Sequence, residues 1–208
     1  MTQRFRVHVG IVAIGAALAL SAPLIAQQPA EREAPTKKDP IRFSAFNVSM
    51  PTGRAGMTQI AIERWTTEDE RSSLLDVLAG AKWGEEGQAK LLKALQAVKP
   101  RVGFIRTANS LGWDLKYARE NALPDGTRQI VIATDKPVSM GAAMRGGRAM
   151  DYPFTFIEMR MKPNDKGEGR MLAASSIIVK DGKLQLENYG QEPVRLTSIT
   201  EEVKKPKS

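Results

Sequence analysis

Residues 169–188 read GRMLAASSIIVKDGKLQLEN, and this stretch decides the fold class. The Asp181-Gly182 pair separates two runs of mostly apolar or alternating residues, 169–180 and 183–188. Asp-Gly between such runs is typical of a two-residue hairpin, because both central residues of its turn need a positive φ. We therefore predict two antiparallel strands joined at Asp181-Gly182.

Further candidate strands lie on both sides of this hairpin. Residues 111–118 alternate most clearly, so Leu111, Trp113, Leu115 and Tyr117 are expected on one face. The other candidates are residues 41–49, 57–65, 101–107, 127–134, 154–162 and 193–200. Nine strands at short spacing predict a mainly β (α+β) fold, an antiparallel sandwich or barrel.

A helical hairpin at about 67–99 interrupts the strands. Thr67 and Glu70 have the spacing of a capping box, so they predict a helix start, and Gly80 predicts its end. A second amphipathic run over 86–98 stops before Pro100, which cannot continue a helix. The sequence thus predicts two helices inserted into a strand-rich chain.

The N-terminus has the pattern of an export signal. Residues 9–26, VGIVAIGAALALSAPLIA, are uncharged, and Arg4 and Arg6 precede them. A basic start, an apolar run and a small-residue exit are typical of a signal peptide. We expect cleavage after Ala26 in a bacterial host, with the protein periplasmic or secreted and not stably inserted in the membrane. The alternative is a retained anchor, since the run is near the minimum length for spanning.

The rest of the chain divides into three parts by composition. Residues 27–40, QQPAEREAPTKKDP, are rich in proline and charge, which predicts a disordered linker. Residues 41–200 have the size of a single domain, and 201–208 form a charged tail.

Composition excludes several kinds of chemistry. The chain has no Cys, and its one His is His8, within the expected signal peptide. A mature chain without His and Cys has no Ser-His-Asp or Cys-His catalysis, no Cys/His zinc site and no disulfide. We expect no catalytic residue, no metal and no cofactor, and hence a non-enzymatic protein.

The charge is moderately basic. The formal charge is +8, and removal of Arg4 and Arg6 with the signal peptide would leave +6. Because the basic residues are spread along the chain, this charge predicts weak attraction to anionic surfaces and no nucleic-acid binding.

The longest irregular stretch of the expected domain is 135–153, DKPVSMGAAMRGGRAMDYP. Arg145 and Arg148 flank a glycine pair there, and arginine forks beside exposed backbone N–H groups can hold a phosphate, sulfate or carboxylate. Three methionines in the same stretch could adapt to an apolar body. The alternative is a solvated surface loop.

Aromatic side chains in the predicted strands form a second candidate. They could line a ligand cavity in a barrel, or they could simply pack in the core. The set comprises Trp65, Phe104, Trp113, Tyr117, Phe154 and Phe156. Arg145, Arg148, Trp113, Tyr117 and Tyr152 are our candidate ligand-binding residues, for a small amphiphile with an anionic end.

Carboxylates form a third candidate. Glu63, Asp114, Glu158 and Glu187 lie in predicted strands, and two that face each other could hydrolyse a glycoside or bind Ca²⁺. Basic residues stand close to three of them, which favours ion pairs on a solvent face. A carboxylate-only hydrolase and a structural or interaction protein of the cell envelope are the two alternatives to a binding protein.

Several short phrases resemble a group of uncharacterised exported bacterial proteins, over about residues 43–200. They are Ile62-Glu63-Arg64-Trp65, Leu115-Lys116-Tyr117-Ala118, Thr134-Asp135-Lys136-Pro137, Asp151-Tyr152-Pro153-Phe154, Leu186-Glu187-Asn188-Tyr189 and Glu192-Pro193-Val194. The resemblance implies bacterial export and a single domain, and it implies no activity.

Overall fold

The computed structural model describes residues 33–50, 53–80, 85–108, 110–138, 151–163, 166–180, 183–188 and 192–202. The chain splits into two compact units, Met1–Ala34 and Pro35–Ser208, and the helices and strands among the described residues belong to the second. The expected signal peptide lies outside the described residues. Within the described ranges, no helix is both long and apolar enough to cross a membrane.

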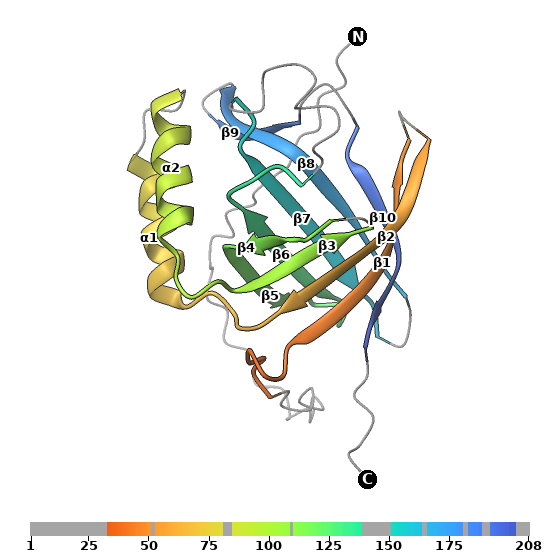
Figure 1. The fold of residues 1–208 in the computed structure, drawn as a ribbon. Helices are drawn as coiled ribbons and strands as arrows, with labels where there is room; N and C mark the ends of the chain where they lie inside the picture. Colours follow the sequence, from red (N-terminus) through yellow and green to blue (C-terminus); the bar gives the residue numbers. More distant parts are fainter. Residues whose placement is uncertain are drawn as a thin grey trace, which may run out of the picture. The chain divides into compact units, whose positions relative to one another are not determined.

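The fold is mainly β, as predicted, with two helices (Figure 1). The helices are α1 (Glu68–Gly80) and α2 (Glu85–Ala97). The strands are β1 (Ile41–Ser49), β2 (Arg54–Ile62), β3 (Gly103–Thr107), β4 (Trp113–Leu115), β5 (Tyr117–Ala122), β6 (Arg128–Thr134), β7 (Phe154–Met161), β8 (Gly167–Lys180), β9 (Lys183–Asn188) and β10 (Val194–Glu201).

The strands form one antiparallel sheet that nearly closes into a barrel, in the order β4-β3-β2-β1-β10-β8-β7-β6-β5. The two end strands, β4 and β5, are consecutive in the chain and are separated only by Lys116. The backbone N–H of Lys116 donates to the Ala133 carbonyl of β6 at 2.9 Å. A single bent segment thus brings the two ends of the sheet together, so the sheet is a nearly closed barrel.

This bend corrects one prediction. Residues 111–118 do not form a single alternating strand, because the chain turns at Lys116 and Leu115 and Ala118 both face the barrel core. Trp113 packs against that core, whereas Tyr117 packs on the outer face against the helices. The two aromatic residues therefore lie on opposite faces of the sheet.

The predicted hairpin is present. β8 and β9 pair in antiparallel register from Ser175 opposite Asn188 to Lys180 opposite Lys183. The turn residues 181–182 lie outside the described residues.

Alternate residues of the strands point into the barrel and fill its middle. Burying such aliphatic side chains contributes roughly 1.5–3 kcal/mol each, so this cluster supplies most of the driving force for folding. The largest fully buried members are Phe43, Ile60, Ile62, Ile105, Leu115, Ile130, Ile132, Ile157, Met159, Leu196 and Ile199.

The helical hairpin packs on the outside of the barrel. Leu74 of α1 and Leu91 and Leu95 of α2 are buried against Phe154 and Ile177. Tyr117 of β5 and Phe156 of β7 lie on either side of Ala133 of β6, opposite which both are paired, and they contribute to the same cluster. The hairpin thus covers the outer face of β5–β8 (Figure 1).

The predicted capping box begins α1. The Glu70 N–H donates to Thr67 Oγ1 at 3.2 Å, and the Thr67 N–H donates to Glu70 Oε2 at 3.0 Å. Arg64 adds two hydrogen bonds of 2.8 Å to the Glu70 carboxylate. One carboxylate therefore caps the helix and ties it to the end of β2.

These contacts predict a pH-dependent contribution to stability. Hydrogen bonds from Arg64 hold the pKa of Glu70 below its ordinary 4.5, against the effect of burial. Because the folded pKa lies below the unfolded pKa, the contribution is complete above the unfolded value and is lost as pH falls through the folded value. We expect Glu70→Gln to cost about 1 kcal/mol of unfolding free energy at pH 7 and much less below the folded pKa. Urea unfolding of both proteins across this range measures the difference, and a cost that does not change with pH would contradict it.

Candidate functional site

The two ends of the barrel differ. The β5–β6 and β7–β8 turns and both connections to the helices lie at one end, here called the base. The β1–β2, β3–β4 and β6–β7 connections lie at the other end, here called the top. Residues 135–153 join β6 to β7, so the two ends of this predicted binding loop both lie at the top.

Ion pairs close the base from inside. Arg128 lies on the inward face of β6, in line with Ile130 and Ile132, and binds Glu120 of β5 at 2.5 Å and Glu201 of β10 at 2.6 Å. β10 and β6 are separated by β8 and β7 in the sheet, so the pair with Glu201 crosses the barrel interior. Although burial opposes the charge, the hydrogen bonds that Arg128 donates to both carboxylates raise its pKa above the ordinary value.

The top end contains polar atoms without partners. Thr58 of β2 is completely buried, and its Oγ1 has no hydrogen-bond partner among the described residues. The same holds for the buried Oδ1 of Asn47 on β1. Asn47 is opposite Gly56 and Ala45 is opposite Thr58, so the two side chains are diagonal neighbours on the inner face. A buried hydroxyl or amide oxygen without a partner costs about 1–3 kcal/mol.

Thr107 of β3 is directly opposite Thr58, and apolar side chains lie at the next inward level. Thr58 lies two residues along β2 from Ile60, which is level with Ile105 of β3 and Trp113 of β4. Met171 of β8 and Val194 of β10 are paired at the same end and belong to the core or pack against it. The arrangement therefore offers one acceptor, one hydroxyl and an apolar wall.

Thr155 shows what a satisfied buried threonine looks like in this fold. Its Oγ1 accepts from the Val138 N–H at 2.8 Å and lies 2.8 Å from the Ala173 carbonyl, to which it can donate. These bonds hold the start of the 135–153 connection against β7 and β8. Thr58 is equally buried and has no such contact, which makes it the exception.

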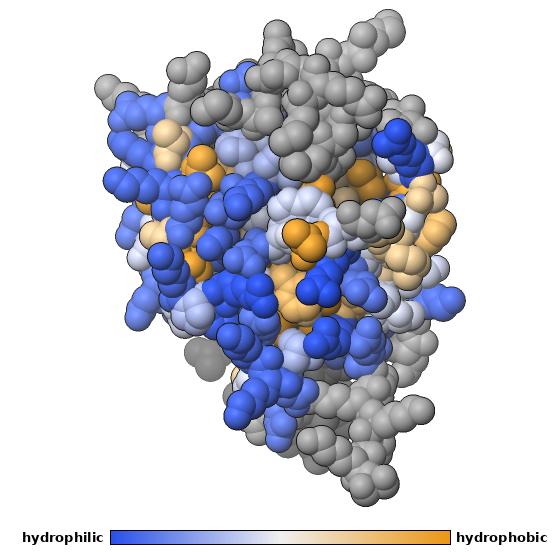
Figure 2. All heavy atoms as spheres, viewed as in Figure 1, coloured by the Kyte–Doolittle hydropathy of each residue, from blue (hydrophilic) through white to orange (hydrophobic). Residues whose placement is uncertain are grey.

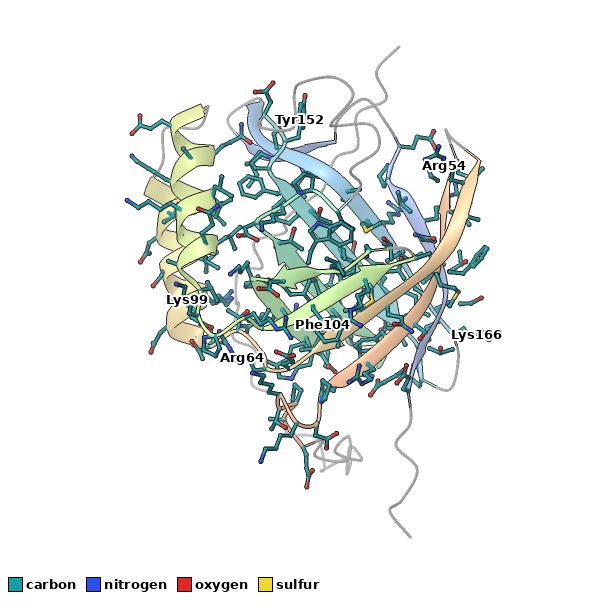
Figure 3. The ribbon with its side chains drawn as sticks, viewed as in Figure 1. Arg54, Arg64, Lys99, Phe104, Tyr152 and Lys166 are labelled. Carbon is teal, nitrogen blue, oxygen red and sulfur yellow. The ribbon has the colours of Figure 1, made fainter. Side chains whose placement is uncertain are left out.

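The predicted binding residues are only partly brought together. Trp113 packs against the barrel core, and Tyr152, which Figure 3 labels, is half-buried just before β7. Tyr117 lies under the helices instead. Arg145 and Arg148 fall outside the described residues.

The aromatic set as a whole divides among three places. Trp65 joins Trp113 against the barrel core, and Phe154 and Phe156 face the helices with ring centroids 5.8 Å apart. Phe104 lies on the outer face of β3, with the guanidinium groups of Arg101 and Arg106 at 5.2 and 5.0 Å from its ring centre. Most of these aromatic residues stabilise the fold.

The candidate carboxylates on or next to the strands form ion pairs with arginines. Arg101 binds Glu63 through two hydrogen bonds of 2.9 and 3.0 Å and binds Asp114 at 2.9 Å. Glu158 accepts from Gln129 at 2.8 Å and from Arg160. Glu63 and Asp114 thus converge, but on a shared guanidinium. Among the described residues, no three acidic, His or Cys side chains converge as a metal site would require.

Sequence reasoning identified neither Thr58 nor Asn47 as a candidate binding residue. A signal was present, since Asn47 continues the alternation of Phe43 and Ala45, and Thr58 continues that of Ile60 and Ile62. A polar residue at an inward position is the feature to look for.

Comparison with protein-family models, with curated proteins and with solved structures finds no match for this chain.

Proposed function

We propose that the protein is an exported, non-enzymatic binding protein that holds a small amphiphilic molecule at the top of its barrel. One observation carries the proposal: the fully buried Thr58 hydroxyl, beside the Asn47 oxygen, has no partner in the described part of the chain. A ligand hydroxyl or amide could donate to Asn47 Oδ1 and bond to Thr58, while its apolar part lies along Trp113 and Met171.

Two further features support this reading. The base is closed by Arg128 and its two carboxylates, so the top is the end at which a ligand would enter. The 135–153 connection, with Arg145 and Arg148, starts from that same end and would supply cations for an anionic ligand group. Export to the periplasm or the medium, and kinship with uncharacterised exported bacterial proteins, are parts of the same proposal.

The Thr58→Val substitution tests this proposal, because valine has the same shape without the hydroxyl. We expect the ligand-free protein to become more stable by about 1 kcal/mol, since an unsatisfied buried group is removed. We expect ligand retention to fall, since the ligand loses that bond. Native and denaturing mass spectrometry of protein exported by a bacterial host reports the ligand as extra mass in the native spectrum alone.

Thr155→Val is the matched control. It removes a hydroxyl that is equally buried but fully bonded, so we expect it to destabilise the protein by about 1–3 kcal/mol. If Thr58→Val destabilises the protein in the same way, or keeps the extra mass, the site is wrong. A wild-type protein that carries no extra mass contradicts the binding function.

A further inference from the structure

The outer face of the β1–β2 hairpin carries exposed apolar side chains. Phe46 is 42% exposed and Met57 51%, and they are directly opposite each other on β1 and β2. Met50, at the β1–β2 turn, is 55% exposed, and Leu111, in the β3–β4 connection, is 99% exposed. Among the described residues, the one further large apolar side chain that is exposed is Leu75 of α1.

The hairpin projects beyond its neighbour. β2 pairs with β3 only as far as Thr58 opposite Thr107, whereas β1 and β2 remain paired to Ser49 opposite Arg54. The exposed apolar pair therefore lies on a tip that stands clear of β3, on the side of Figure 1 away from the helices. Figure 2 shows hydrophobic residues gathered on that side, and Figure 3 places Arg54 at the tip.

Cations surround this apolar surface. Residues 41–62 contain no Asp or Glu, while Arg42 and Arg54 fall within them. On the outer face, Arg195 of β10 is opposite Val48, and Arg106 of β3 is opposite Gln59, so both are diagonal neighbours of the Phe46–Met57 pair. The acidic residue that precedes β10 in the chain is Glu192, which lies two residues before the first residue of that strand.

We propose that this tip patch, formed by Phe46, Met50, Met57 and Leu111 with Arg54, Arg106 and Arg195, docks the protein on an anionic lipid bilayer. Apolar side chains on projecting turns can enter the interface between headgroups and acyl chains, and arginines beside them attract the anionic headgroups. The contact is peripheral and reversible. It stands independently of the proposed ligand, although it would hold the top of the barrel against a membrane.

The charge pattern selects lipid over a second copy of the chain. In a two-fold symmetric contact the same patch occurs on both sides, so the arginines of one copy would face those of the other. Like charges brought together in an interface are unfavourable. An anionic bilayer satisfies the apolar and the cationic parts of the patch at once.

Vesicle co-sedimentation tests the proposal on the chain from Gln27, which contains the whole compact unit Pro35–Ser208 and lacks the apolar N-terminal run. We expect binding to vesicles containing phosphatidylglycerol, weakening with added salt, and little binding to pure phosphatidylcholine. The Phe46→Ser/Met57→Ser variant should reduce the partition coefficient about tenfold or more, and Arg106→Gln/Arg195→Gln about tenfold. Leu75→Ser, at the comparably exposed apolar residue of α1, should leave it unchanged.

Circular dichroism and thermal melting show whether each variant is folded. A wild-type chain that does not sediment with anionic vesicles overturns the proposal, as does equal loss with Leu75→Ser. Analytical ultracentrifugation measures the oligomeric state. If the wild-type chain is a dimer and the Phe46→Ser/Met57→Ser variant is a monomer, the patch is a self-association surface and the lipid proposal is wrong. Because a phospholipid is itself an amphiphile, Thr58→Val separates the two proposals: it should leave vesicle binding unchanged, and failure of the wild-type chain to bind vesicles leaves the ligand site of Thr58 to its own test.

Discussion

Gly103→Ala is expected to destabilise the protein by about 3 kcal/mol or more, and it could prevent folding altogether. A Cβ at this position would stand 2.1 Å from the Ala61 carbonyl oxygen and 3.1 Å from the Ile62 Cα. Both atoms belong to the backbone of β2, which is held by β1 on its other side. Because a backbone in the middle of a sheet cannot move alone, the clash must separate β3 from β2.

Gly80→Ala is the control for Gly103→Ala, and its effect should have the opposite sign. Gly80 is the last residue of α1, and no atom lies within 4 Å of the position a Cβ would take. Alanine there should stabilise the helix by up to about 1 kcal/mol. Urea unfolding followed by circular dichroism measures both variants. A Gly103→Ala protein with a wild-type midpoint would show that β2 and β3 do not approach as closely as described.

Arg101→Met should cost about 2–3 kcal/mol. One guanidinium joins the end of β2, the start of β3 and the closing strand β4 through Glu63 and Asp114. The Glu63 side chain is only 9% exposed, so without Arg101 its charge would remain buried and unpaired. The hydrogen bonds also raise the pKa of Arg101 above its ordinary value, so the guanidinium is charged at every relevant pH.

Arg101→Met/Glu63→Gln should recover part of this loss, because the buried charge is removed together with its partner. Arg160→Met serves as the comparison, since the side chains of Arg160 and Glu158 are 55% and 38% exposed and such pairs contribute less than about 1 kcal/mol. Equal losses for Arg101→Met and Arg160→Met, measured by urea unfolding, would mean that the three-strand connection is not important for stability.

Local chemistry explains which elements could be predicted. The Asp181-Gly182 hairpin, the capping box of Thr67 and Glu70, and the stop before Pro100 each depend on a few neighbouring residues, and the structure has the corresponding strands and helices. The break at Lys116 could not be read in this way, because the residue carries no turn signal. Its cause is the hydrogen bond to Ala133, which exists only once β6 stands beside it.

The ion pairs show the same limit at the level of side chains. Along the chain Arg64 is next to Glu63 and Lys116 is close to Asp114, whereas in the structure both carboxylates bind Arg101 and Arg64 binds Glu70. Glu158 and Arg160 do pair as their spacing suggested, since residues two apart on a strand share a face. The difference is that Glu63 and Arg101 meet only after a helical hairpin has returned the chain to β2.

The sequence by itself determined that this chain is mainly β with an inserted helical hairpin, because alternation, turn residues and caps act over a few residues. Only the tertiary structure decided that the sheet nearly closes into a barrel, that the helical hairpin covers its outer face, and that Arg128 closes its base. It also decided that Thr58 is buried without a partner while Thr155 is fully bonded. Closure of the sheet and hydrogen bonding of buried polar side chains both depend on which distant strands become neighbours, and no local sequence pattern encodes that.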